Sequence, residues 1–84
     1  MINYKKIQDA IDREEDLAMS IGASDTFLDA VDLLQEGVDF GYNEDEWFSV
    51  LREIRHNHFG RARGEMKSIL DNLLTRVLDA VEFG

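Results

Sequence analysis

The 84-residue chain contains no cysteine and no proline. Without cysteine it has neither a disulfide framework nor a thiolate zinc site, so its stability must come from packing, oligomerisation or a bound partner. No apolar run approaches the roughly 20 residues that a membrane span needs. The N-terminal segment MINYKKIQDAID also lacks the continuous apolar core of a secretory signal. We therefore expect a protein of the reducing cytoplasm that has no membrane partner.

The sequence motifs of common enzymes are missing as well. There is no cysteine nucleophile, no Gly-x-Ser-x-Gly elbow, no GxxxxGK[ST] phosphate loop and no GxGxxG pattern. A small helical domain also offers little concave volume for a substrate. The sequence therefore favours a non-enzymatic protein, and no cofactor is expected.

Cationic residues are few and unevenly placed. The chain has 9 lysines and arginines against 18 aspartates and glutamates, which gives a net charge of −9. Residues 52–67, here called the basic segment, hold five of those nine cations and both histidines, whereas residues 1–51 carry a formal charge of −10. A surface of this sign disfavours direct binding to nucleic acid or anionic lipid and favours attraction to basic proteins.

Apolar residues recur at helical spacing in four segments, and no segment alternates like a strand. The first runs from about Tyr4 to Ile21, and Gly22 ends it because glycine adopts the left-handed conformation of a helix C-terminus without a clash. Ser24 is placed to cap the second segment by accepting a hydrogen bond from an early amide. Gly37 resembles a second glycine stop, so we expect residues 39–42 to form a loop.

The third segment begins after Asn43, which stands three residues before Glu46, the spacing of a capping box. It is expected to reach Phe59. The fourth segment carries apolar residues over about half of its circumference, which is wider than one neighbour requires. That helix is either central in the bundle or shared with a second copy. The sequence thus predicts one all-α domain over residues 1–84, a compact bundle of three to four helices, with a homodimer through the last helix as an alternative.

Residues 17–31, LAMSIGASDTFLDAV, resemble the core of a helix-turn-helix motif. Ala18 stands where that family has a small residue, and Gly22 stands at the turn. The resemblance implies a second helix that enters the major groove of DNA. Residues 24–29, which would face the bases, include no arginine, lysine, glutamine or asparagine to read them. We interpret the segment as a tight corner between two helices.

The two histidines raise the hypothesis of a metal site, because Glu53 and His56 have the Glu-x-x-His spacing of di-iron bundles. On a helix, however, His56 and His58 point apart, and Glu53 lies opposite the apolar face of the third segment. We predict no metal site.

The piece GRARG, residues 60–64, places two arginines between glycines. Arginine offers a forked donor for phosphate or carboxylate, so an anion site is one interpretation. With so many carboxylates in the first half of the chain, we expect Arg61 and Arg63 to pair with the protein's own acidic residues.

Four carboxylates of the second segment recur at positions i, i+4, i+7 and i+11, which makes one continuous negative ridge on a helix. Like charges at this spacing cost a few tenths of a kcal/mol per pair, so the sequence either tolerates or uses the repulsion. The predicted partner-binding residues are the four carboxylates of the ridge and one aromatic anchor: Asp25, Asp29, Asp32, Glu36 and Trp47. Trp47, or its neighbour Phe48, is expected to act as the anchor if its side chain is exposed.

In size, charge and predicted helicity the chain is similar to phage-encoded inhibitors, such as anti-CRISPR and nucleic-acid-mimic proteins, and to immunity proteins against nuclease toxins. The resemblance implies an inhibitor in the bacterial cytoplasm that docks on a basic protein partner, either a nucleic-acid-binding complex or a nuclease. Two alternatives remain at this stage. One is a small helix-turn-helix-like transcriptional regulator, and the other is an oligomerising structural module.

Overall fold

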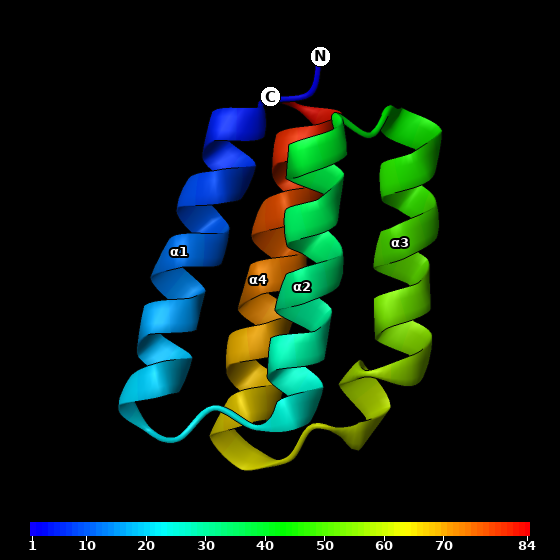
Figure 1. Cartoon of the computed structure of the whole chain (residues 1–84). Coiled ribbons are helices and arrows are strands. Elements are labelled where there is room, and N and C mark those ends of the chain that lie inside the picture. Colours follow the sequence, from blue (N-terminus) through cyan, green and yellow to red (C-terminus); the bar gives the residue numbers. More distant parts are fainter.

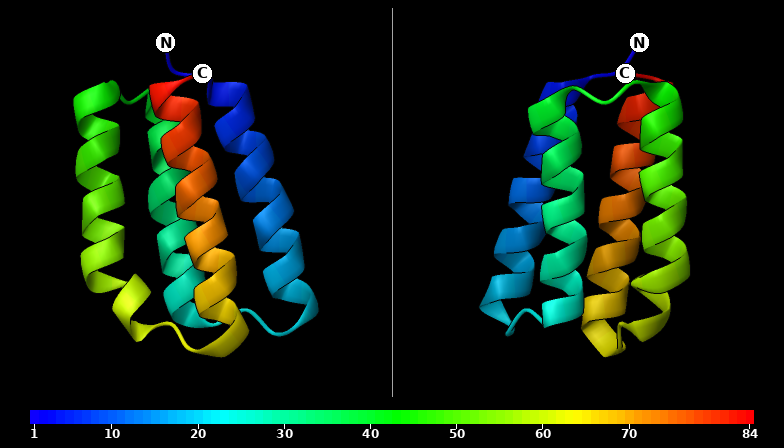
Figure 2. Two further views of the ribbon diagram at one scale, coloured as in Figure 1. Left: turned by 180° about the vertical axis from the view of Figure 1, so that it is seen from behind. Right: turned by 45° about the vertical axis from the view of Figure 1, so that its right-hand side comes forward.

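Four helices run alternately up and down in the computed structural model, which describes all 84 residues (Figure 1). They are α1 (Tyr4–Ser20), α2 (Asp25–Phe40), α3 (Glu44–Asn57) and α4 (Gly64–Glu82), with a one-turn 3₁₀ helix, η1 (Phe59–Arg61), between the last two. Each helix packs antiparallel to the next in the chain, and α4 closes the ring against α1 (Figure 2). The prediction of an all-α bundle is confirmed. None of the helices is long and apolar enough to cross a lipid bilayer.

The core consists of one apolar face from each helix, with Trp47 and Phe27 as its largest buried side chains. Full burial of a side chain such as leucine or phenylalanine contributes about 1.5–3 kcal/mol, so this core is the main source of stability. The wide apolar arc of α4 is explained by its central place, because α4 packs against both α1 and α3 of the same chain. Leu78 is the one large apolar residue of this arc that is exposed, with 38% of its surface accessible. A homodimer through α4 remains a prediction.

The predicted helix starts are confirmed. The Ser24 side chain accepts a hydrogen bond from the Phe27 amide at 3.2 Å. Asn43 and Glu46 form a reciprocal capping box, with side-chain-to-amide distances of 2.9 and 3.0 Å. These bonds satisfy amides that have no partner within the helix.

The predicted stop of α2 at Gly37 is wrong. The helix continues to Phe40 and ends at Gly41, whose left-handed backbone (φ 65°) supplies the turn. Gly37 is instead buried inside the helix against Trp47, and a Cβ at this position would lie 2.5 Å from Cη2 of that ring. Glycine is therefore required here by close packing with α3 and not by backbone conformation.

The predicted end of α3 at Phe59 is also wrong, since the α-helix stops at Asn57. The amide of Arg61 donates to the His58 carbonyl at 3.0 Å, which tightens the chain into η1. This tight turn carries the chain across the end of the bundle to α4.

Residues 17–31 do not adopt helix-turn-helix geometry. Helices of that motif meet at about 90–120°, whereas α1 and α2 lie side by side and antiparallel (Figures 1 and 2). Gln8, in the first half of α1, bonds to Gln35, in the second half of α2, at 2.8 and 2.9 Å. The turn at Gly22, which has a φ of 88°, therefore closes a helical hairpin.

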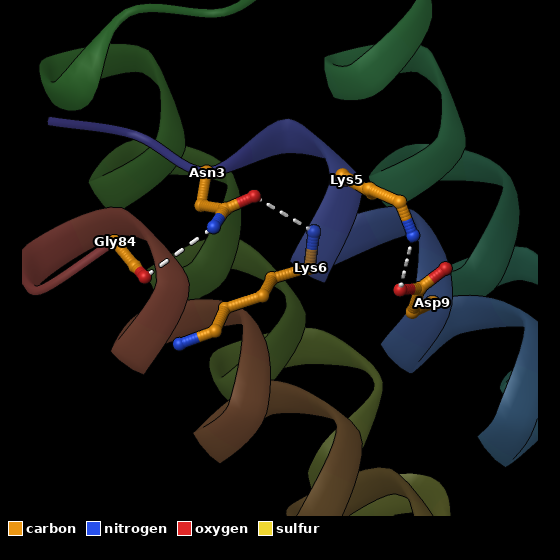
Figure 3. A network of polar contacts seen from close by, with 5 residues as sticks. All are labelled: Asn3, Lys5, Lys6, Asp9 and Gly84. Carbon is orange, nitrogen blue, oxygen red and sulfur yellow. Dashed lines mark hydrogen bonds and ion pairs between the residues drawn. The ribbon is translucent and has the colours of Figure 1, made fainter.

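The two ends of the chain meet at one end of the bundle (Figure 3). Asn3 accepts from the Lys6 amide at 3.0 Å to cap α1, while its side-chain amide donates to the Gly84 carbonyl at 3.4 Å. Its backbone amide donates to Ala80 at 3.0 Å. The Tyr4 hydroxyl donates to the Tyr42 carbonyl. These bonds join the start of α1 to the end of α4 and to the α2–α3 turn.

Candidate functional site

The four predicted ridge carboxylates lie on the exposed face of α2, turned away from the core: Asp25, Asp29, Asp32 and Glu36. None of them belongs to either of the two ion pairs of the molecule, which join Lys5 to Asp9 and Arg55 to Asp71. The whole helix contains five carboxylates and no lysine or arginine. The ridge is therefore exposed and unneutralised.

The cations of the neighbouring helix α1 face another direction. Lys6 and Arg13 line a hollow of about 280 Å³ on the α4 side of α1, together with Arg76. Lys5 pairs with Asp9 one turn along the same helix at 3.3 Å. Neither ion pair of the molecule joins a cation of α1 to the ridge.

Two functional candidates on α2 are missing from the predicted site, because the prediction of a glycine stop at Gly37 excludes them from the helix. Asp39 is exposed and adds a fifth carboxylate to the ridge, and Phe40 beside it is 76% exposed. Helical periodicity could have indicated that the helix continues through Gly37. This glycine follows Leu34 by three residues and Ala30 by seven, and both of those are core positions. From here on, the acidic ridge means the four predicted residues together with Asp39.

The seam between α1 and α2 orients further carboxylates. Gln8 and Gln35 exchange two hydrogen bonds, and each amide also donates to an aspartate one turn along its own helix, Asp12 and Asp39, at 3.0 Å. These bonds hold one carboxylate on each side of the seam in a defined position. Pre-ordered side chains lose less entropy when a partner binds.

Trp47 cannot serve as the aromatic anchor of this surface. Its side chain is 0% exposed, packs on Gly37 and meets the Tyr42 ring edge-on with 5.7 Å between centroids. The interpretation of Trp47 as a partner-binding residue is wrong, because the tight α2–α3 contact places it in the core. Phe48 is half-buried, so Phe40 is the exposed aromatic residue beside the ridge.

A hollow of about 270 Å³ opens on the other flank of α2, between α2 and α3. We call it the α2–α3 groove. Its lining combines three apolar or aromatic side chains with one hydroxyl and two carboxylates: Leu33, Tyr42, Val50, Ser49, Glu46 and Glu53.

The basic segment is bound largely to itself and to α4. Arg55 pairs with Asp71 at 3.0 Å, and its guanidinium lies 5.0 Å from the centroid of the Phe59 ring. The Lys67 ammonium lies 4.9 Å from the same centroid. These contacts join the end of α3 to the start of α4.

The predicted pairing of the GRARG arginines with the acidic half is wrong. Arg63 donates to the carbonyls of Gly60 and Ala62 at 2.9 and 3.1 Å, Arg61 is exposed, and neither forms an ion pair. The backbone carbonyls of its own turn take up the Arg63 guanidinium, and the α3–α4 connection that carries both arginines crosses one end of the bundle (Figure 1).

The histidine region does not assemble a ligand set. Glu53 and His56 are exposed on α3, while His58 is half-buried with its Nδ1 atom lacking a hydrogen-bond partner. No three histidine, aspartate or glutamate side chains converge in a metal-binding arrangement.

No protein-family model, curated protein or solved structure matches this chain. The acidic ridge and its surroundings are therefore the features of the molecule that bear on its function.

Proposed function

We propose that this is a non-enzymatic binding protein that docks the acidic ridge on a basic, nucleic-acid-handling protein and inhibits it. One observation carries the proposal: α2 presents five exposed carboxylates, has no lysine or arginine of its own, and forms no ion pair with a neighbouring helix. Adjacent like charges on a helix cost a few tenths of a kcal/mol per pair. A basic partner converts this repulsion into attraction and raises the association rate by electrostatic steering.

The spacing of the charges supports a partner that handles nucleic acid. From Asp25 to Asp39 the ridge extends roughly 21 Å at a helical rise of about 1.5 Å per residue, or about one charge per 5 Å. A DNA strand carries one phosphate per about 3.4 Å of helix axis. A protein groove that binds a phosphate backbone would therefore find on α2 a line of negative charges with a comparable spacing. Anti-CRISPR proteins, nucleic-acid mimics and nuclease immunity proteins, which the chain is similar to in size, charge and helicity, are the classes of inhibitor of a bacterial cytoplasm that fit this proposal.

Affinity capture from the native host tests the proposal. The wild-type chain should retain a basic protein that the Asp29→Lys/Asp32→Lys variant loses at the same salt concentration. The matched control is Glu65→Lys/Glu82→Lys, which changes the net charge equally at exposed positions of α4 and should retain the partner. Circular dichroism establishes that all three proteins are folded.

Inhibition is then measured directly. Adding the wild-type chain should reduce nucleic-acid binding or cleavage by the captured protein, and adding the ridge variant should not. Capture that is equal for the wild type and the ridge variant would refute the proposal. A low-salt gel shift of the chain itself with DNA would favour a transcriptional regulator instead.

A further inference from the structure

The α2–α3 groove lies beside the acidic ridge and joins apolar surface to acidic surface. Leu33 and Val50 contribute the apolar part from opposite sides. Asp29 and Glu36, both exposed ridge residues, stand four residues before and three residues after Leu33, so all three share one side of α2. The groove therefore has carboxylates along the α2 edge as well as along the α3 edge.

The carboxylates on the α3 edge are available as acceptors. Glu46 uses Oε1 to accept from the Asn43 amide at 3.0 Å, which fixes the side chain and leaves Oε2 free. Glu53 belongs to neither ion pair of the molecule. With Ser49 between them, these residues recur at i, i+3 and i+7 and lie on one side of α3. No lysine or arginine of the chain lines the groove.

The size of the groove limits what it can hold. At about 270 Å³ it is smaller than the roughly 300–1,000 Å³ of typical small-molecule sites. It matches one long side chain of a partner better than a complete ligand. Its apolar lining requires an aliphatic portion in that side chain, and its acidic edges require a cationic end.

We propose that the α2–α3 groove receives an arginine side chain of the basic partner. This deepens the proposed function and depends on it. The aliphatic stem lies on Leu33 and Val50, as the stems of long cationic side chains do on apolar surface. The planar guanidinium presents a fork of donors to the Glu53 carboxylate, and Glu46, two turns away on the same edge, adds to the negative charge of the groove. Lysine has a similar stem but ends in a compact charge, which does not bind a carboxylate in this forked manner.

A titration of the ¹⁵N-labelled full chain tests the assignment without requiring the natural partner. The probe is a blocked helical peptide with arginine and leucine on one face, and the comparison probe has lysine at every arginine position. The arginine peptide should shift the amide signals of Leu33, Ser49 and Val50. The lysine peptide should shift signals of the outward ridge, such as Asp32, and leave the groove signals in place.

Two matched variants measure the contribution of the groove. Glu53→Gln should weaken binding of the arginine peptide by about fivefold, in line with the loss of a charge-assisted contact. Glu65→Gln makes the same change of charge at an exposed site on α4 and should leave the affinity unchanged.

Each remaining outcome decides against a defined claim. Shifts confined to the outward ridge for both peptides overturn the groove and leave the proposed function standing. Equal groove shifts for the arginine and lysine peptides overturn the selectivity for arginine. No shifts with either peptide would contradict the acidic docking surface itself, and the proposed function with it.

Discussion

The acidic ridge on α2 and the basic segment of residues 52–67 differ in how their charges are engaged within the molecule. In the basic segment, three of the five cations have contacts within the molecule: Arg55 bonds to Asp71, Arg55 and Lys67 both contact Phe59, and Arg63 donates to backbone carbonyls. The ridge carboxylates have no cationic partner. Charges that are already bound support the fold, and charges that are unbound remain free to attract a partner. The number of charges in a segment therefore says less about function than their internal contacts.

The largest expected effect comes from breaking the contacts of the basic segment. Phe59→Ala removes the half-buried ring that Arg55 and Lys67 share, and it should lower the free energy of unfolding by about 2 kcal/mol. Phe40→Ala is the matched control, because that ring is 76% exposed at the end of the ridge. Its effect should stay within about 0.5 kcal/mol. Urea unfolding followed by circular dichroism measures both, and equal losses would show that Phe59 has no special structural role.

Glu14 is an unpaired carboxylate on the core side of α1, and it can be compared with the exposed unpaired carboxylates of the ridge. Glu14 is 2% exposed on the core face of α1 and belongs to neither ion pair. Its carboxylate oxygens are not among the buried atoms that lack a partner, so the group keeps contact with water at the edge of the core. Methionine keeps the packing of the buried stem and removes a charge from apolar surroundings, so Glu14→Met should raise the free energy of unfolding by about 1 kcal/mol.

Glu15→Met is the control for that variant, since it makes the same charge change at a more exposed neighbour and should have less than half the effect. Both variants are compared by urea unfolding. A loss of stability in Glu14→Met would instead indicate that the buried carboxylate contributes favourably to the fold.

The smallest expected effects have opposite signs in the two regions. Asp29→Asn/Asp32→Asn should raise the free energy of unfolding by about 0.5 kcal/mol at low salt by relieving repulsion along the ridge. Arg55→Gln should lower it by about 0.5 kcal/mol, because that partly exposed pair and ring contact are weak.

The salt dependence shows whether the increase in the free energy of unfolding of the double asparagine variant comes from relief of electrostatic repulsion. Near 1 M salt, where the screening length is about 3 Å, the gain of the double asparagine variant should disappear. Thermal or urea unfolding at two salt concentrations measures this. Changes of the same sign in both regions would contradict the distinction between bound and unbound charges.

Much of the fold and of the ridge was predictable because the relevant signals act over four residues or fewer. The cap at Ser24, the capping box at Asn43 and the glycine turn at Gly22 all formed as predicted. The exposed positions of the ridge followed from helical periodicity. The prediction of where α2 ends was wrong, because Gly37, which is required by packing, resembled a glycine that stops a helix. The α2–α3 groove was not predictable, because its lining comes from two helices whose register the sequence pattern does not state.

The sequence by itself determined four amphipathic helices and a line of carboxylates on the second, because periodicity and capping are local properties. Only the tertiary structure decided the partners of those helices. Close packing of α2 on α3 buried Trp47 over Gly37 and removed it from the surface. The register of α1 on α2 joined Gln8 to Gln35, and the packing of α3 on α4 paired Arg55 with Asp71. Contacts between helices depend on how side chains of distant segments fit together, so the ridge is a property of the sequence, whereas its lack of a partner is a property of the fold.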